Sequence, residues 1–319
     1  MRRGAGMKDR PGRSCPLSYR YSQAVLTQGP ALKVETLWLA GGLYGNPFAL
    51  DTLIELFERE PGSKALVFNG DFHWFDTEAG DFSRINDAVL GFVAMRGNVE
   101  TELVLPDARA GCGCGYPDWV DDATVQRSNR ILERLRATAS PLAGVERLAK
   151  LPMHLVAEVG SDRVAVVHGD AESLAGWGFS QEALATASGF AAALDAFESA
   201  GVRIFASSHT CLPVLQRFAG DRVLVNNGSA GMPNFRGTTF GLATRISVHA
   251  SGRALYASKA NSLFVEAVPL DYDAVAWQRR FLAQWPEGTD AHRSYFDRIA
   301  HGPRYEPGQA LRRETALAP

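Results

Sequence analysis

The stretch Ala65-Leu66-Val67-Phe68-Asn69-Gly70-Asp71 predicts a buried strand that delivers one carboxylate to the edge of a sheet. Its apolar run is rich in branched side chains and ends abruptly in a polar turn, which is typical of a core strand. An Asp in this position most often only caps a turn or the next helix. A chemical role for Asp71 therefore depends on which polar residues follow the other strands.

The first half of the chain alternates strands with helices, whereas the second half is rich in strands. Strands are predicted over residues 34–40, 65–70, 92–95, 153–158, 163–168, 202–206, 214–218, 222–226, 241–249 and 254–258. Helices are predicted to begin near Pro47 and to cover residues 82–90, 122–136 and 189–200. This order indicates an α/β protein in which two packed β-sheets, a β-sandwich, are flanked by helices.

The chain divides into three predicted segments. Residues 1–30 lack clear periodicity, and we expect a partly disordered extension that lies against the domain through Tyr19 and Tyr21. Residues 31–268 form the predicted α/β domain. Residues 269–319 are helical in pattern and then polar, so we expect a C-terminal helical tail packed on that domain.

Composition narrows the class of partner. The chain has 319 residues, 46% of them hydrophobic and 21% charged, as in ordinary globular proteins. With 33 basic and 35 acidic residues, it shows no broad footprint for nucleic acid or anionic lipid, so a small-molecule partner is expected. No apolar stretch is long enough for a membrane span, and no hydrophobic signal region follows Met1. The default expectation is a cytoplasmic protein, and the sequence indicates no particular oligomeric state.

Four polar residues follow predicted strands: Asp71, Asn98, His168 and His209. Each has an ordinary structural explanation, such as a turn former for Asn98 or a hydrogen-bonded core histidine for His168. Together, a carboxylate, an amide oxygen and two imidazoles form a ligand set for a borderline divalent transition metal such as Mn, Fe or Zn. Small neighbouring residues allow close approach, which favours one shared metal site.

Five short blocks resemble, in order, those of the calcineurin-like metallophosphoesterase superfamily. They are Gly45-Asn46, Gly70-Asp71, Gly97-Asn98, His168-Gly169 and Ser208-His209-Thr210-Cys211, and Asn227-Gly228-Ser229 resembles the turn that follows them. The similarity extends over residues 34–258. It implies a four-layer fold, with a double β-sandwich between helices, and a two-metal hydrolase of phosphoric esters.

The resemblance also implies which ligands are kept and which are changed. The second of the family's two metal sites is complete here as Asp71, Asn98, His168 and His209. In the first site, Gly42 and Tyr44 stand where the family has Asp and His, and Cys211 stands where its last His belongs. Val99 replaces the usual His after the Asn of the third block. We therefore expect one metal ion and leave a second one open.

Three interpretations of the altered site compete. In the first, one ion binds phosphate and activates water, while Arg96, His73 or Tyr44 stabilises charge or donates a proton. In the second, Tyr44 and Cys211 help to rebuild the first metal site, and their soft donors favour Zn or Fe. In the third, the fold is a non-catalytic binding scaffold. A metal-dependent phosphoesterase is the function that we predict, and the scaffold is the alternative.

The remaining candidates lie in loops. Cys112 and Cys114 occupy a glycine-rich part of a predicted loop insertion over residues 101–121. They are most simply free thiols, because their one-residue spacing is tighter than that of structural zinc sites, but the glycines would let them reach Cys211 as additional ligands. The tryptophans near these blocks either wall a substrate pocket or pack in the ordinary way. They are Trp74, Trp119 and Trp177.

Overall fold

The strand β3, Lys64–Asn69, lies between two strands to which it is parallel, β2 (Thr36–Ala40) and β4 (Val93–Met95). A computed structural model describes residues 11–312 of the chain. Ala65 and Val67 of β3 face a second sheet, whereas Leu66 and Phe68 face helices. Both faces of the strand are therefore covered, which explains its uninterrupted apolar run.

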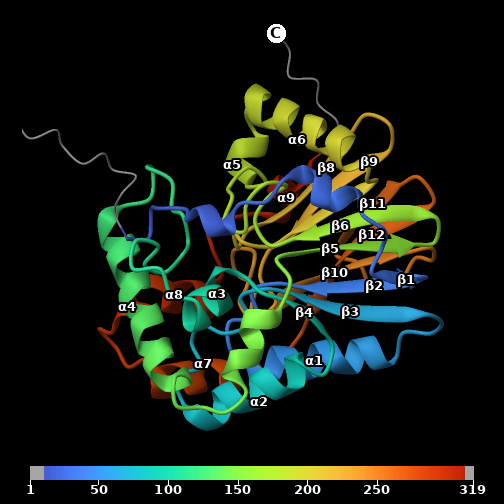
Figure 1. Cartoon of the computed structure of the whole chain (residues 1–319). Helices are drawn as coiled ribbons and strands as arrows, with labels where there is room; N and C mark the ends of the chain where they lie inside the picture. Colours follow the sequence, from blue (N-terminus) through green and yellow to red (C-terminus); the bar gives the residue numbers. More distant parts are fainter. Residues whose placement is uncertain (1–10, 313–319) are drawn as a thin grey trace, which may run out of the picture.

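Two mixed sheets pack face to face (Figure 1). The first contains, in spatial order, β11 (Tyr256–Ala260), β12 (Leu263–Leu270), β10 (Gly241–Ser247), β2 (Thr36–Ala40), β3 and β4 (Val93–Met95). The second contains β1 (Leu32–Val34), β5 (His154–Val159), β6 (Asp162–Val167), β7 (Ile204–Ser207), β9 (Arg222–Asn227), β8 (Pro213–Phe218) and β13 (Leu311–Arg312). Branched apolar side chains fill the space between the sheets.

Helices cover the outer face of each sheet, so the fold has four layers (Figure 1). The six-stranded sheet is covered by α1 (Pro47–Glu58), α2 (Ala79–Val89), α3 (Asn98–Val104), α4 (Asp122–Ala139), α7 (Ala274–Gln284) and α8 (Asp290–His301). The seven-stranded sheet is covered by α5 (Gln181–Leu184) and α6 (Ala187–Ala200). The short helix α9 (Pro307–Ala310) precedes β13. The predicted sandwich flanked by helices is confirmed.

Some predicted boundaries need correction. The segment 34–40 contains two strands rather than one, because the chain crosses from the seven-stranded sheet to the six-stranded sheet at Glu35. The predicted loop over 101–121 begins inside α3. The strand β12 was not predicted, and it runs through the expected domain boundary at residue 268. Because β13 joins the seven-stranded sheet, the C-terminal segment is not purely helical.

The described part of the N-terminal segment is tied to the body of the protein. Residues 1–10 lie outside the described range. Tyr19 is buried, and its hydroxyl donates to Glu102 Oε1 at 2.6 Å. The Tyr21 hydroxyl donates to the carbonyl of Asp170 at 2.6 Å. These contacts bring the segment next to the helix that follows β4, which contains Glu102, and next to the loop that follows β6.

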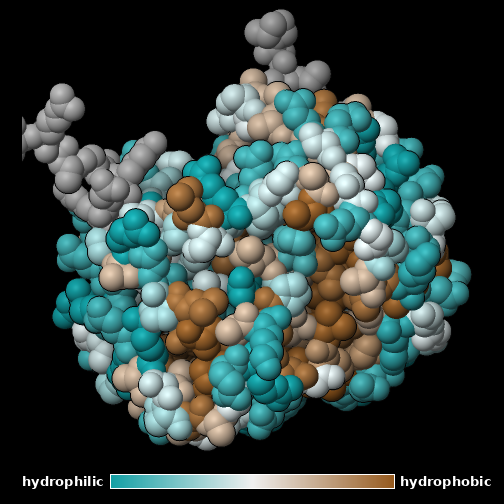
Figure 2. Space-filling model, in the orientation of Figure 1, coloured by the Kyte–Doolittle hydropathy of each residue, from teal (hydrophilic) through white to brown (hydrophobic). Residues whose placement is uncertain are grey.

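The surface is polar with apolar interruptions. On the face drawn in Figure 2, hydrophilic residues are interleaved with patches of apolar ones. Trp119 is one of the large apolar side chains that are mostly exposed, at 62%. Within residues 11–312, no helix has the length and apolar character that crossing a membrane requires.

Candidate metal centre

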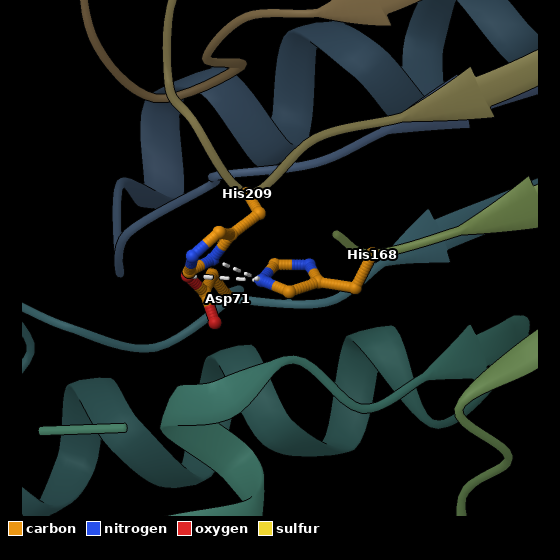
Figure 3. Close-up of side chains that lie close together, drawn as sticks. All are labelled: Asp71, His168 and His209. Atoms are coloured by element: carbon orange, nitrogen blue, oxygen red, sulfur yellow. Dashed lines mark hydrogen bonds and ion pairs between the residues drawn. The ribbon is translucent and has the colours of Figure 1, made fainter. Parts of the chain in front are cut away.

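The four predicted ligands come from strand ends of both sheets. Asp71 and Asn98 follow β3 and β4 of the six-stranded sheet, and His168 and His209 follow β6 and β7 of the seven-stranded sheet. All four side chains are buried. Figure 3 shows that Asp71, His168 and His209 point toward one another from separate strand ends. The centre therefore forms where the carboxyl ends of strands from both sheets meet.

His168 lies at the middle of this group. Its Nε2 atom is 3.4 Å from Asp71 Oδ2, 3.3 Å from Asn98 Oδ1 and 3.3 Å from His209 Nδ1. The ligand atoms of Asp71, His168 and His209 all lie within 4.8 Å of one another. No other group of three His, Cys, Asp or Glu side chains in the described range 11–312 meets this condition. The arrangement is a candidate metal-binding cluster.

Backbone carbonyls fix the orientation of both imidazoles. His168 Nδ1 lies 2.8 Å from the Asn69 carbonyl, and His209 Nε2 lies 2.9 Å from the Cys114 carbonyl. A carbonyl only accepts, so each of these nitrogens carries the proton of the neutral ring. The lone pairs of the other two nitrogens then face each other and the oxygens of Asp71 and Asn98. Four electron-rich atoms converge, and such a set fits a cation.

Electrostatics supports the same conclusion. Burial, together with a smaller contribution from a charge on His168, lowers the pKa of His209 to about 4. Burial alone would lower the pKa of His168, but the Asp71 carboxylate outweighs it and the pKa is raised. Burial raises the pKa of Asp71, but the neighbouring His168 outweighs it and the pKa is lowered. The Asp71 carboxylate therefore favours a positive charge at this position.

Glu100 is a positioning residue of the centre that sequence reasoning missed. Its carboxylate is fully buried and accepts backbone N–H groups of Gly97 and Asp71, both at 2.8 Å, and of Phe72 at 3.0 Å and His73 at 3.3 Å. Burial raises its pKa, and the nearby Asp71 raises it further. Glu100 thereby joins the turn after β3 to the start of α3. A Glu three residues after the residue that precedes a helix is a capping pattern, and that spacing was the available signal.

The backbone is unusual at this centre. Five non-glycine residues in the described range have positive φ, and three of them line one cavity beside the cluster: Tyr44 (55°), Asp71 (52°) and Cys211 (63°). Such conformations are costly for residues with a Cβ atom and concentrate at functional sites. The strain therefore supports a functional role for the cavity.

The cavity beside the cluster is small and largely aromatic. It has a volume of about 60 Å³ and is lined by Tyr44, Asp71, Trp74, Asn98, Val99, Cys114, Tyr116, Trp177, His209, Cys211 and Tyr295. Trp177 packs edge-on against His209 at 5.5 Å and donates its indole N–H to the Cys114 carbonyl at 3.0 Å. Trp74 and Trp177 thus wall the cavity, whereas Trp119 lies outside it against Trp177.

Comparison with known proteins identifies the fold. No family model matches the chain, and no curated protein is significantly similar to it in sequence. Among solved structures, it is similar to a metallophosphoesterase from Sphaerobacter thermophilus, with 16% identity over 85% of this chain and 100% of that chain and a TM-score of 0.53. The chain has the calcineurin-like metallophosphoesterase fold. A likeness at this identity shows the fold and leaves activity to be argued from the site.

Two further structures with lower scores are similar over most of their length. A serine/threonine phosphatase from Saccharomyces cerevisiae is 15% identical over 78% of this chain and 90% of that chain, with a TM-score of 0.38. Vps29 from Entamoeba histolytica, solved in complex with Zn²⁺, is 10% identical over 74% of this chain and 99% of that chain, with a TM-score of 0.35. The assignment of the metallophosphoesterase fold rests on the first comparison and on the layers described above.

Tyr44 and Cys211, which stand at positions where the family resemblance implies metal ligands, form a hydrogen-bonded pair. The Tyr44 hydroxyl and Cys211 Sγ lie 2.6 Å apart, and the thiol also lies 3.3 Å from the His209 carbonyl. Burial raises the pKa of Tyr44, and a negative charge on Cys211 raises it further. Burial also raises the pKa of the Cys211 thiol. Both groups therefore line the cavity in their protonated forms, and neither belongs to the cluster of three ligands described above.

The Cys112 and Cys114 sulfurs do not belong to that cluster either. They lie 2.7 Å from each other, and both residues are buried. Their backbone carbonyls contribute instead, because Asn98 Nδ2 donates to the Cys112 carbonyl at 3.0 Å and His209 Nε2 to the Cys114 carbonyl. Both cysteines are free thiols, as the simpler interpretation expected, and the alternative that their sulfurs join the cluster is not supported: the loop orients two candidate ligands, Asn98 and His209, through its main chain.

His73 and Arg96 also need correction, because neither side chain lines the cavity. The His73 ring is buried, with Nδ1 at 2.6 Å from Asp76 Oδ2, and it stacks on Phe82 at 3.8 Å between centroids. Arg96 donates from Nη1 to the Ala149 carbonyl at 2.9 Å. These partners hold the His73 ring and the Arg96 guanidinium away from the cavity. Of the three predicted catalytic residues, only Tyr44 lines the cavity.

Proposed function

We propose that this protein is a metal-dependent hydrolase of phosphoric esters that works with a single metal ion. The observation that carries the proposal is the convergence of the Asp71, Asn98, His168 and His209 donor atoms at the meeting point of the two sheets. The Tyr44–Cys211 pair favours one ion over two, because the hydroxyl and the thiol are hydrogen-bonded to each other at 2.6 Å and Cys211 lies outside the cluster of three ligands.

The donor set indicates the kind of ion. Two imidazole nitrogens, one carboxylate and one amide oxygen suit Mn, Fe or Zn better than Ca, which prefers oxygen ligands throughout. When bound, such an ion supplies Lewis-acid polarisation of the phosphoryl group and activation of water. The donors are oriented in advance by the Asn69 and Cys114 carbonyls.

The chain's own residues supply the rest of the site. Glu100 holds the turn that carries Asp71, and the Val99 N–H donates to Asp71 Oδ1 at 3.1 Å, which fixes that carboxylate. Trp74 and Trp177 give the cavity beside the cluster apolar walls. The Tyr44 hydroxyl lies in the cavity wall, where it can donate a hydrogen bond to a phosphoryl oxygen or a proton to a leaving group.

The test combines metal content with turnover. We expect the purified chain to bind one equivalent of Mn²⁺ or Zn²⁺ in titration calorimetry and to hydrolyse aryl phosphate esters. Asp71→Asn should abolish stoichiometric binding and lower kcat/KM by about 100-fold or more. Asp195→Asn, at an exposed position of α6, is the matched control and should change neither quantity.

A second function, a non-catalytic binding scaffold, is favoured by the changes in the first metal site. Tyr44 and Cys211 replace metal ligands there, and Val99 removes a side chain that could donate a proton. Stoichiometric metal loading without turnover of monoesters or diesters would support the scaffold and contradict the hydrolase.

A further inference from the structure

We infer that the site selects phosphodiesters with a single negative charge and a planar aromatic substituent, an inference that rests on the proposed function. Three observations carry it: the lining of the cavity bears little charge, its volume is small, and a chain of aromatic rings leads from the metal cluster to the surface. Each limits which phosphoric ester fits.

The cavity offers an ester almost no positive charge of its own. Within residues 11–312, no lysine or arginine lines it, and Asp71 is its one acidic side chain. Arg298 and Glu100 lie behind the lining. Arg298 donates to the Cys211 carbonyl at 2.8 Å and to the Pro233 carbonyl at 3.0 Å, and Glu100 accepts backbone N–H groups. These two opposite charges offset each other.

The net charge that a metal-loaded site would present to the substrate is therefore about one positive charge. A divalent ion beside the Asp71 carboxylate, with both imidazoles neutral, leaves a single net positive charge in a buried site. A phosphodiester carries one negative charge and neutralises it, whereas a monoester near neutral pH carries nearly two, since its second pKa is about 6. The surplus negative charge of a monoester would have to be buried among aromatic walls without a partner, which is costly.

The volume of the cavity places the ester substituents. A cavity of about 60 Å³ can take a phosphoryl group but is too small to enclose the two substituents of a diester as well. The substituents of a diester must therefore lie at its mouth. Trp177, half-buried against His209, also contacts the exposed Trp119 edge-on at 6.1 Å. These two indoles form a surface on which a flat apolar group can pack.

The test measures binding, so it does not require turnover. The Mn²⁺-loaded full chain is titrated by calorimetry with phenyl phosphate, methyl phenyl phosphate and diphenyl phosphate. We expect the Kd of methyl phenyl phosphate to be lower than that of phenyl phosphate, and the Kd of diphenyl phosphate to be about 10-fold or more below that of phenyl phosphate.

Two variants separate the contributions of charge and stacking. Trp119→Ala should reduce the preference for diphenyl over methyl phenyl phosphate by about 3- to 10-fold, and Trp119→Phe should keep it. Tyr295→Lys adds a cation to the cavity lining and should shift binding toward phenyl phosphate. Val275→Lys, at an exposed position of α7, adds the same charge at a remote place and should not.

The outcomes are distinguishable from those for the proposed function. Equal or tighter binding of phenyl phosphate, or no gain from the second aromatic ring, would overturn the inference, as would binding of none of the three esters. If the diester preference is found while no ester is hydrolysed, the selectivity stands and the hydrolase proposal fails.

Discussion

Glu100 shows how a single buried side chain can organise the backbone around a site. Its two oxygens accept four N–H groups, from Gly97 and from the turn that begins at Asp71. Glu100→Gln keeps the size of the side chain but replaces one acceptor oxygen by an NH₂ group that faces N–H donors. We expect the free energy of unfolding to fall by about 3 kcal/mol, because buried donors lose their partners. Urea denaturation followed by circular dichroism measures this change.

A matched substitution controls for the loss of a negative charge. Glu133 is exposed on α4, so Glu133→Gln should change the free energy of unfolding by no more than about 0.5 kcal/mol. Similar small effects for both variants would show that Glu100 is not required to hold the turn after β3.

At the scale of an element, the loop from Gly111 to Gly115 acts through its main chain. Gly113 has a φ of 72°, and a Cβ atom there would collide with the Tyr19 hydroxyl and lie 3.1 Å from Asn98 Cβ. Gly113→Ala should therefore displace the carbonyls that orient Asn98 and His209. We expect the Kd for Mn²⁺ to rise by about 10- to 100-fold, as is usual when groups that hold metal ligands are changed. Competition with a chelating dye measures this affinity.

Another glycine provides the control for backbone strain. Gly237 has nearly the same φ, 69°, and a Cβ atom there would have no neighbour within 4 Å. Gly237→Ala should cost stability in the same way and leave the Kd for Mn²⁺ within about 2-fold. Equal loss of affinity in both variants would mean that the loop does not position the ligands through these contacts.

For the whole molecule, the sequence was most informative where a buried strand both packs in the core and places a polar side chain at its end. The apolar run before Asp71 predicted β3, and strand ends predicted the places of Asp71, Asn98, His168 and His209. The break between β1 and β2 at Glu35 was hidden because polar residues such as Lys33 and Glu35 alternate with apolar ones within an ordinary strand, so they do not mark a change of sheet. The roles of Glu100 and of the Cys114 carbonyl depend on contacts between distant segments, which periodicity does not report. His73 was misjudged because Asp76 and Phe82, rather than its place after Asp71, determine its direction.

The last prediction concerns the stability of the whole fold in acid. Arg245 on β10 donates two hydrogen bonds to Glu60, both at 2.8 Å, and one to Glu266 of β12 at 2.7 Å, and these side chains are almost fully buried. The network ties the chain just after α1 to the six-stranded sheet, and the Arg245 hydrogen bonds lower the pKa of Glu60.

A lowered folded-state pKa stabilises the protein above the unfolded pKa, about 4.3, and this stabilisation is lost as the pH falls through the folded-state value. Glu60→Gln should therefore cost about 2 kcal/mol at pH 7 in urea unfolding, and the difference from the unmodified protein should shrink progressively below about pH 4.3. A difference that stays constant down to pH 3 would show that the charge of Glu60 does not contribute to stability.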